Sequence, residues 1–302
     1  MIRIVDAGFH STVQDRGRFG FLRAGVPPAG PADPVAFRAA LALAGCAEDE
    51  AAIEVVGTPF RFICDDARLV AVTGRDVHLT IHRRLPGWMS VLVRAGELVT
   101  VGGTARTQFA YVAVSGGIAT APVLGARATY PLAGLGSALR PGDRLPLGPA
   151  RPSPVAAGRR VAPAEYAGVA YAIPGPHLDH FGPEALASLF DQAFTVAAAG
   201  DRQGKRLTGR PLPLTSDREL ASCGVVTGAI QVPRSGQPIV LLADRQTTGG
   251  YPVIATVVDH DLGQIAQTAP GEAVRFRRAD PELAVGLLRA ERSLLAGLRG
   301  FA

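Results

Sequence analysis

The sequence predicts a mainly β chain with a few helices, and three observations indicate this fold class. The 302 residues are 47% apolar, enough to fill one large or two modest cores. The 36 glycines and 24 prolines provide many turns, which favours short strands over a helical bundle. Apolar runs also recur about every eight to twelve residues between 52 and 115, the spacing of an antiparallel barrel or sandwich. The runs are AIEVV, FRFIC, RLVAVT, VHLTIH, SVLVR, ELVTV and FAYVAVS.

Two helices have clear start signals. Asp33-Pro34 combines an N-cap residue with a proline in the first turn, and Gly45 ends the apolar face that follows. Asp280-Pro281 begins a last helix with a leucine face, which would dock on the chain's own barrel or on a partner subunit. Between the opening strand, residues 1–5, and the first helix, residues 6–32 are rich in Gly and Pro. We expect a long functional loop there.

Residues 228–252 are the most informative stretch. Two apolar runs, 228–233 and 238–243, flank a tip of Arg, Ser, Gly and Gln, which predicts a hairpin with a buried second strand. The second run passes directly into the polar residues 244–252. A rigid strand that ends in such residues is a common way to present a site, although a solvated loop has the same composition.

Composition excludes several function classes. The net charge of +5 comes mostly from scattered arginines with no interleaved aromatic residues, so we expect no nucleic-acid partner. Lys205 is the only lysine, which rules out a GxxxxGK[ST] phosphate loop and a biotin attachment site. No apolar stretch has membrane-spanning length and the N-terminus lacks a signal-peptide core, so we expect a cytoplasmic protein. The three cysteines indicate no disulfide or zinc framework.

Several motifs resemble one known family, that of the 5-oxoprolinase C subunit, KipA and allophanate hydrolase subunit 2. The same family supplies half of the carboxyltransferase region of urea carboxylase. The matching motifs are TVQDRGR at 12–18, GVPPAG at 25–30, AVSGGI at 113–118, PVLG at 122–125, GDRLPLG at 142–148, PGP at 174–176, DRQGKRL at 201–207, GAIQVP at 228–233 and GQPIVLLADRQTTGGYP at 236–252.

The resemblance implies two cyclophilin-like β-barrel domains and a chain that does not work alone. We place the first domain at residues 1–150, a linker at 151–166, and the second domain with its terminal helix at 167–302. The implied partners are a KipI-like B subunit, with a LamB/YcsF-type A subunit in many relatives. ATP would be shared with or carried by those partners.

The resemblance implies one leading function and two alternatives. The leading hypothesis is one subunit of an ATP-dependent 5-oxoprolinase, which opens a five-membered lactam to glutamate. One alternative is biotin-dependent carboxyl transfer to urea or a similar amide, with the biotin on another chain. The other is a KipA-like regulator that binds an inhibitor of a histidine kinase and catalyses no reaction.

The predicted site centres on the hairpin and the polar loop. Gln231 and Asp244 are the predicted catalytic residues, with Asp244 as base or water orienter. Arg245 suits a substrate carboxylate or phosphate, but neighbours on a strand point to opposite faces, so only one of Asp244 and Arg245 would face the site. The other predicted substrate-binding residues are Gln246, Thr247, Thr248, Gly249, Gly250, Tyr251, Gly116, Gly117 and His177.

For several of these residues a structural interpretation stays open beside the functional one. The double glycine at 116–117 would expose N–H groups to an anion or form a bulge. A neutral His177 would contact the carbonyl of a bound ligand. His177 and His180 could share a metal ion, but no third ligand for that ion is near them, so we expect no metal site. Five further residues would either hold loops by ion pairs or contact the ligand: Gln14, Asp15, Arg18, Asp201 and Arg202.

Overall fold

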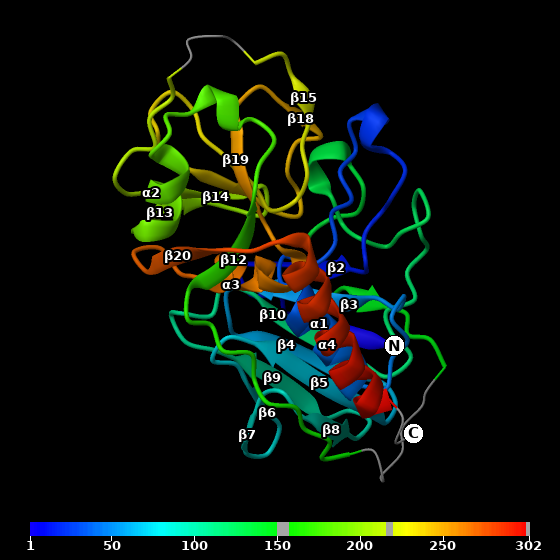
Figure 1. Cartoon of the computed structure of the whole chain (residues 1–302). Helices are drawn as coiled ribbons and strands as arrows, with labels where there is room; N and C mark the ends of the chain where they lie inside the picture. Colours follow the sequence, from blue (N-terminus) through cyan, green and yellow to red (C-terminus); the bar gives the residue numbers. More distant parts are fainter. Residues whose placement is uncertain (150–156, 216–219, 300–302) are drawn as a thin grey trace. The chain divides into compact units, whose positions relative to one another are not determined.

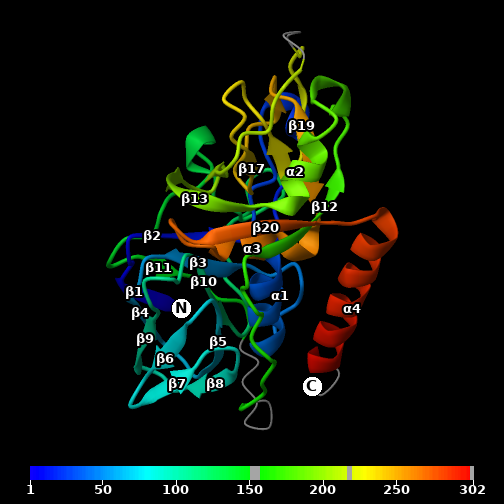
Figure 2. The same cartoon turned by 60° about the vertical axis from the view of Figure 1, so that its left-hand side comes forward.

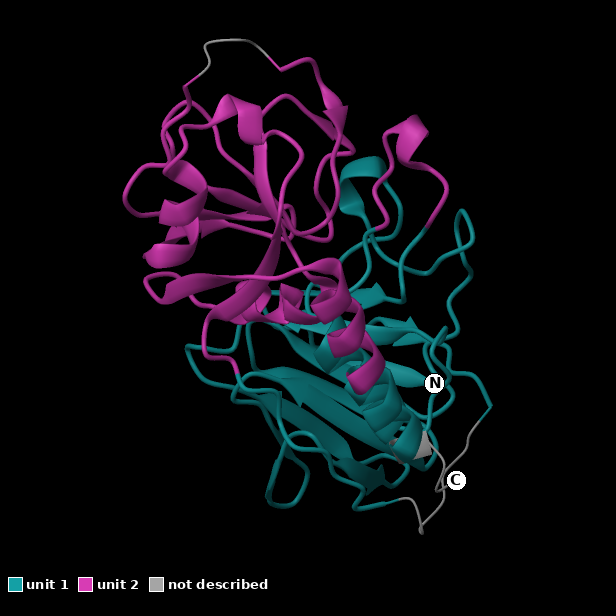
Figure 3. Ribbon diagram, viewed as in Figure 1, with its two compact units in different colours: residues 1–18, 29–165, 291–302 teal, residues 19–28, 166–290 magenta. Residues whose placement is uncertain are grey.

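The computed structural model describes residues 1–149, 157–215 and 220–299. Residues 151–156 of the predicted linker lie outside these ranges. The chain divides into two compact units, which Figure 3 colours separately. Unit 1 comprises Met1–Arg18, Ala29–Glu165 and Glu291–Ala302, and unit 2 comprises Phe19–Pro28 and Tyr166–Ala290.

Unit 1 is built mainly from two antiparallel sheets, and the predicted mainly β fold is confirmed (Figure 1). The six-stranded sheet has the order β11-β1-β4-β9-β6-β7, and the five-stranded sheet has the order β2-β3-β10-β5-β8. The strands are β1 Ile2–Asp6, β2 His10–Gln14, β3 Ala52–Val56, β4 Phe60–Cys64, β5 Arg68–Gly74, β6 His78–Thr80, β7 Arg84–Pro86, β8 Ser90–Val93, β9 Leu98–Gly102, β10 Ala110–Val114 and β11 Arg144–Leu145.

Strand β2 corrects the prediction that residues 6–32 form one long loop. It pairs with β3 from His10 opposite Val56 to Gln14 opposite Ala52. Its sequence, HSTVQ, carries mostly polar side chains, yet residues 11–14 are all buried. Buried polar side chains remove the apolar alternation by which a strand is recognised in sequence.

The first helix is confirmed. α1, Pro34–Leu43, begins as predicted, because the Asp33 carboxylate accepts a hydrogen bond from the Ala36 N–H at 3.1 Å. The helix packs against β5 and β10, where the Thr73 hydroxyl donates to the Ala36 carbonyl at 2.6 Å. Its alanine- and leucine-rich sequence lets most of its residues be buried.

Unit 2 contains a closed barrel of seven strands in the order β12-β19-β16-β17-β14-β13-β20. Neighbouring strands are antiparallel except β12 and β20, which are parallel; β13 and β20 run side by side in Figure 2. The strands of the unit are β12 Val169–Pro174, β13 Ala193–Gly200, β14 Gly204–Thr208, β15 Cys223–Gly224, β16 Ala229–Gln231, β17 Ile239–Leu241, β18 Thr248–Gly249, β19 Val253–Val257 and β20 Ala273–Arg278. The helices are η1 Leu22–Ala24, η4 Leu178–His180, α2 Ala185–Asp191, η5 Asp259–Asp261 and α3 Leu262–Gln267.

Apolar side chains fill the inside of the barrel. Leu207 of β14, Ile230 of β16 and Val240 of β17 all belong to one buried cluster. Because side chains alternate along a strand, the residues on either side of these three point outward. The outer face of the β14-β17-β16 wall therefore offers the surface on which a site can be built.

The hairpin predicted at 228–243 is confirmed as β16 and β17, which pair with Ile230 opposite Val240. The last helix is confirmed as α4, Pro281–Arg299, whose Asp280 carboxylate accepts from the Leu283 N–H at 2.8 Å. In the part of α4 that belongs to unit 1, Leu295 is buried, and Glu291 accepts a hydrogen bond from Arg38 of α1 at 2.7 Å. None of the helices in the described parts of the chain is long and apolar enough to cross a bilayer.

Candidate functional site

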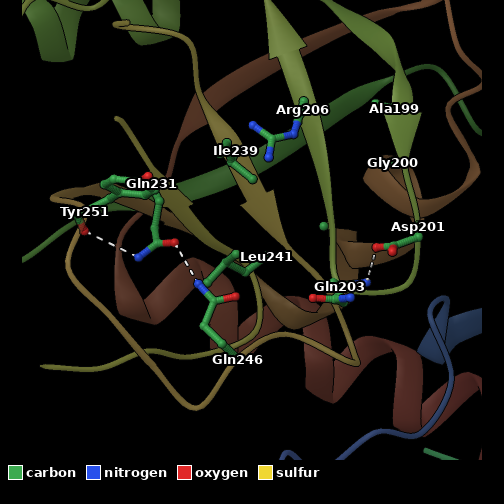
Figure 4. Close-up of a pocket in the computed structure, with 11 residues that line it drawn as sticks. Ala199, Gly200, Asp201, Gln203, Arg206, Gln231, Ile239, Leu241, Gln246 and Tyr251 are labelled. Carbon is green, nitrogen blue, oxygen red and sulfur yellow. Dashed lines mark hydrogen bonds between the residues drawn. The ribbon is translucent and has the colours of Figure 1, made fainter. Parts of the chain in front are cut away.

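A pocket of unit 2 lies on the outer face of the barrel wall. Its volume is about 460 Å³. Figure 4 shows the residues that line it. The wall strands provide its floor, and the polar loop after β17 provides one side. The lining residues are Ala199, Gly200, Asp201, Gln203, Gly204, Arg206, Gln231, Ile239, Leu241, Gln246 and Tyr251.

Strand register brings two polar groups to opposite sides of this floor. Arg206 of β14 pairs with Ile239 of β17, and Ile239 pairs on its other side with Gln231 of β16. The three residues therefore form one row across adjacent strands. With strands about 4.8 Å apart, the Arg206 and Gln231 backbones are separated by roughly 10 Å. A small molecule over Ile239 would lie between a guanidinium and an amide.

The Gln231 and Gln246 side chains form a coupled amide pair. Gln246 Nε2 donates to Gln231 Oε1 at 3.1 Å, and Gln231 Nε2 donates to the Tyr251 carbonyl at 3.4 Å (Figure 4). Gln231 is buried, whereas Gln246 is exposed on the pocket side. After these bonds Gln246 keeps its Oε1 acceptor and one N–H donor. The structure thus brings together the predicted site residues Gln231, Gln246 and Tyr251.

Gly249 contributes by having no side chain. A Cβ atom at this position would lie 2.7 Å from Gln231 Nε2 and 3.3 Å from Gln246 Nε2. The residue belongs to β18, where it pairs with Cys223 of β15. Gly249 was predicted to bind substrate; in the structure it lets the loop pass close to both amides.

Asp244 forms a buried ion pair with Arg202. Arg202 Nε and Nη2 donate to the two carboxylate oxygens of Asp244 at 2.8 and 2.9 Å. The Asp244 N–H also donates to the Arg202 carbonyl at 2.9 Å. This bidentate pair joins the two motifs DRQGKRL and ADRQTTGG, and neither residue lines the pocket. Both carboxylate oxygens of Asp244 are occupied by the guanidinium, so the geometry favours a positioning role for Asp244.

Arg245 is buried beside this pair without a carboxylate partner among the described residues. Its Nη1 donates to the Gln246 carbonyl at 3.3 Å, and its Nε has no partner in the described chain. Burial lowers the pKa of the guanidinium from its ordinary value. Arg245 does not line the pocket, nor do Thr247, Thr248 and Gly250. The carbonyl of Thr247 accepts from the Val225 N–H, and Thr248 belongs to β18.

His177 supports the loop between β12 and η4. Its Nδ1 accepts a hydrogen bond from the Val253 N–H at 3.1 Å, so this nitrogen carries a lone pair. The His177 and His180 rings meet edge to face, with centroids 6.2 Å apart. Across the described residues no group of three or more His, Cys, Asp or Glu side chains is placed to bind a metal ion.

Gly116 and Gly117 belong to unit 1, so they do not line the pocket of unit 2. Both have positive φ angles, 89° and 64°. The Gly148 N–H donates to the carbonyls of both residues at 3.1 Å, and a Cβ on Gly116 would lie 2.5 Å from the Pro149 carbonyl oxygen. The double glycine therefore allows close approach of two backbone segments, which is a structural role.

Gln14, Asp15 and Arg18 also belong to unit 1 and hold its loops. Asp15 accepts from the Gly17 and Arg127 N–H groups at 2.9 and 2.6 Å. Gln14 donates to the Thr129 carbonyl, and Arg18 donates to the carbonyls at positions 123 and 128. Of the three, only Arg18 lines a smaller pocket of about 240 Å³ in this unit.

The family model of the carboxyltransferase domain, subdomains A and B, matches residues 24–278. The chain belongs to the carboxyltransferase-domain family.

Two curated members of this carboxyltransferase-domain family are 33% identical to the chain. One, the 5-oxoprolinase C subunit of Escherichia coli K12, aligns over 94% of this chain and 93% of its own length. The other, the 5-oxoprolinase C subunit of Haemophilus influenzae, aligns over 99% and 98%. The urea amidolyase of Saccharomyces cerevisiae is 28% identical over 91% of this chain, which corresponds to only 16% of that protein.

Solved structures of the carboxyltransferase-domain family show the same architecture. The crystal structure of TTHA0988 superposes with a TM-score of 0.82 at 30% identity, over 91% of this chain and 55% of that one. The chain thus spans about half the length of that protein. The K. lactis urea amidolyase superposes with a TM-score of 0.88 at 23% identity, over 98% of this chain and 20% of that one, which indicates the shared fold alone.

Arg206 is the charged pocket residue that sequence reasoning missed in this carboxyltransferase domain. It was noted within the DRQGKRL motif but not placed in the site. The signal was present, because Leu207 is apolar and its neighbour Arg206 must face the other way on a strand. What the sequence did not contain was the pairing of Arg206 with Ile239, which directs it toward the amide pair.

Proposed function

We propose that this chain is one subunit of an ATP-dependent 5-oxoprolinase, and that the pocket on the barrel wall binds the lactam substrate. Two relatives named as the C subunit of 5-oxoprolinase match it over nearly their whole length, which supports the proposal. By name these relatives are parts of multi-subunit enzymes. The proposed partners are a KipI-like B subunit, together with a LamB/YcsF-type A subunit.

The observation that carries the proposal is the amide pair at the edge of the pocket. A lactam is a cis amide, so its N–H donor and its carbonyl acceptor lie on the same side of the ring. Gln246 presents the complementary groups, one acceptor and one donor, and Gln231 restrains it through a 3.1 Å hydrogen bond. Preorganised donors of this kind bind and polarise an amide carbonyl.

The reaction adds water to the lactam carbonyl and breaks the ring C–N bond. The ring nitrogen takes a proton and becomes the amino group of glutamate, while the carbonyl becomes its second carboxylate. The chain's own residues would hold the ring over Ile239 and orient its carbonyl toward the Gln246 donor. ATP hydrolysis would activate the unstrained amide.

The residues of the pocket do not fit ATP itself. A triphosphate needs several cations, but the charged lining residues are one arginine and one aspartate, Arg206 and Asp201. Lys205, the only lysine of the sequence, points into the barrel and donates to the Thr268 carbonyl at 2.6 Å. We therefore assign ATP to one of the partners.

Carboxyl transfer to an amide nitrogen is the second candidate. The family match and the likeness to urea amidolyase favour it. The same amide pair would bind urea through its carbonyl and N–H groups, and a separate chain would carry the biotin. The two candidates differ in the charge of the substrate, because urea is neutral and 5-oxoproline is an anion.

The decisive experiment uses the complex of this chain with both proposed partners. We expect 5-oxo-L-proline-dependent ATP hydrolysis and glutamate formation. Gln246→Leu should raise the KM about tenfold, as expected for the loss of two neutral hydrogen bonds. The matched control is Thr195→Val on the outer face of the same barrel, which should leave the KM unchanged.

Three outcomes would contradict the proposal. Full activity of a Gln231→Ala, Gln246→Ala double variant would show that the pocket takes no part in the reaction. Biotin-dependent carboxylation of urea without 5-oxoproline turnover would establish the second candidate. A stable complex with a KipI-like protein that turns over neither substrate would indicate a KipA-like regulator.

A further inference from the structure

Arg206 provides a cationic group in the pocket that no group of the described residues neutralises. Within the described chain its guanidinium makes neither a hydrogen bond nor an ion pair, and the side chain is exposed. By contrast, Arg202 on the same hairpin is buried in its pair with Asp244. An arginine that faces a pocket without a carboxylate partner is available to bind an anion.

The direction of Arg206 follows from the strand alternation of β14. Lys205 and Leu207 are buried and face the barrel interior, so Arg206 faces outward. In Figure 4 its side chain extends from β14 beside Ile239. The backbone separation of roughly 10 Å from Gln231 leaves space between the guanidinium and the amide pair for one small ring.

Gly204 has no side chain, so no atoms extend from this position into the pocket beside Arg206. A Cβ on this residue would lie 2.8 Å from the Val240 carbonyl oxygen and 3.5 Å from Ile239 Cγ2. The other charged lining residue, Asp201, lies at the turn of the hairpin, where its Oδ1 accepts from the Gln203 N–H at 2.7 Å (Figure 4). The pocket is therefore negative at Asp201 and positive at Arg206. Arg206 is the one that shares a row across the strands with Gln231.

We propose that Arg206 recognises the carboxylate of the substrate and thereby selects an anionic lactam over a neutral amide. The inference rests on the proposed function, since it assigns the ligand charge of that same pocket. A ring amide with a carboxylate on the neighbouring carbon presents both groups from one small molecule. Its amide edge meets Gln246, and its carboxylate meets the guanidinium. Urea has only the amide part and gains nothing from Arg206.

The test compares three probes on the full chain in complex with its KipI-like partner. The probes are 5-oxo-L-proline, the uncharged lactam 2-pyrrolidinone, and urea, with binding measured by calorimetry or ligand-observed NMR. We expect the wild type to bind 5-oxo-L-proline about tenfold or more tightly than 2-pyrrolidinone, as for a charge-assisted bond. Arg206→Gln should remove this preference while leaving the affinity for 2-pyrrolidinone unchanged.

The matched control is Arg277→Gln. Arg277 is an exposed arginine on β20 of the same barrel and does not line the pocket, and its substitution removes the same charge. This variant should keep the full preference for the anion. Arg206→Lys should restore part of it, because the ammonium keeps the charge but lacks the planar fork.

The outcomes separate the inference from the function it rests on. Retention of the anion preference by Arg206→Gln, or equal binding of the two lactams by the wild type, would overturn the role of Arg206 and leave the lactam site standing. Binding of neither lactam by the wild type would overturn both. The Arg206→Gln variant could also lose binding of both lactams at an unchanged melting temperature. This result would show that Arg206 maintains the shape of the pocket and does not recognise the carboxylate.

Discussion

Substitution of Asp244 separates its positioning role from a role as catalytic base. The Arg202 and Asp244 side chains are 10% and 7% exposed, and two hydrogen bonds join them. Asp244→Asn keeps the shape of the side chain but removes the negative charge, so that the buried Arg202 guanidinium loses its ion pair with Asp244. Breaking a buried ion pair in this way costs about 3 kcal/mol. For a unit of this size we expect the melting temperature to fall by roughly 9 °C.

Thermal unfolding followed by circular dichroism measures this loss, and turnover of the complex at low temperature is measured in parallel. The double variant Arg202→Met, Asp244→Leu should recover much of the lost stability, because two apolar side chains replace both charges. We expect Asp244→Asn to retain measurable turnover below its melting temperature. A variant that melts like the wild type but has no turnover would refute the positioning role and establish Asp244 as the base.

Three further substitutions test other parts of the structure. Gly249→Ala should raise the KM for the lactam several-fold with little change in melting temperature, because the new methyl group displaces the flexible end of Gln231. Burial lowers the pKa of Lys205 from 10.5 to about 8, so between these pH values the unfolded chain binds more protons and stability rises with pH. Lys205→Met should abolish this rise, which urea unfolding at pH 8 and pH 10 measures. Tyr111→Phe should cost about 2 kcal/mol in urea unfolding, since the buried Glu54 carboxylate loses the phenol donor at 2.9 Å.

Each of these predictions has a clear contrary result. An unchanged KM for Gly249→Ala would mean that the amide pair does not bind the lactam. The same pH dependence in wild type and Lys205→Met would place the protonation change on another group. A Tyr111→Phe variant as stable as the wild type would show that water replaces the lost hydroxyl at Glu54.

Local sequence signals predicted the elements that depend on local physics. Three elements could be predicted in this way: the cap at Asp33, the hairpin 228–243 and the final helix from Pro281. Caps, turn residues and apolar runs each act over only a few positions. Strand β2 could not be predicted from the local sequence, since its side chains are mostly polar and its partner β3 lies about forty residues further along the chain. Pairing of that kind is a property of the folded chain.

The site could be predicted only in part for a similar reason. Gln231, Gln246 and Tyr251 lie within the stretch 228–252 that the sequence identified, and all three line the pocket. Asp244 lies in the same stretch, but the partner that occupies it, Arg202, comes from a motif forty-two positions away. No local pattern reveals that a carboxylate is already paired.

The packed barrel interior has a consequence for how such domains diversify. The residues that face the pocket and those that fill the barrel alternate along β14, β16 and β17, so each kind can change without the other. A substitution at Arg206 alters the preferred ligand at little expense to folding. One fold can in this way acquire new substrates by exchanging a few outward side chains, while the apolar interior preserves the framework that positions them.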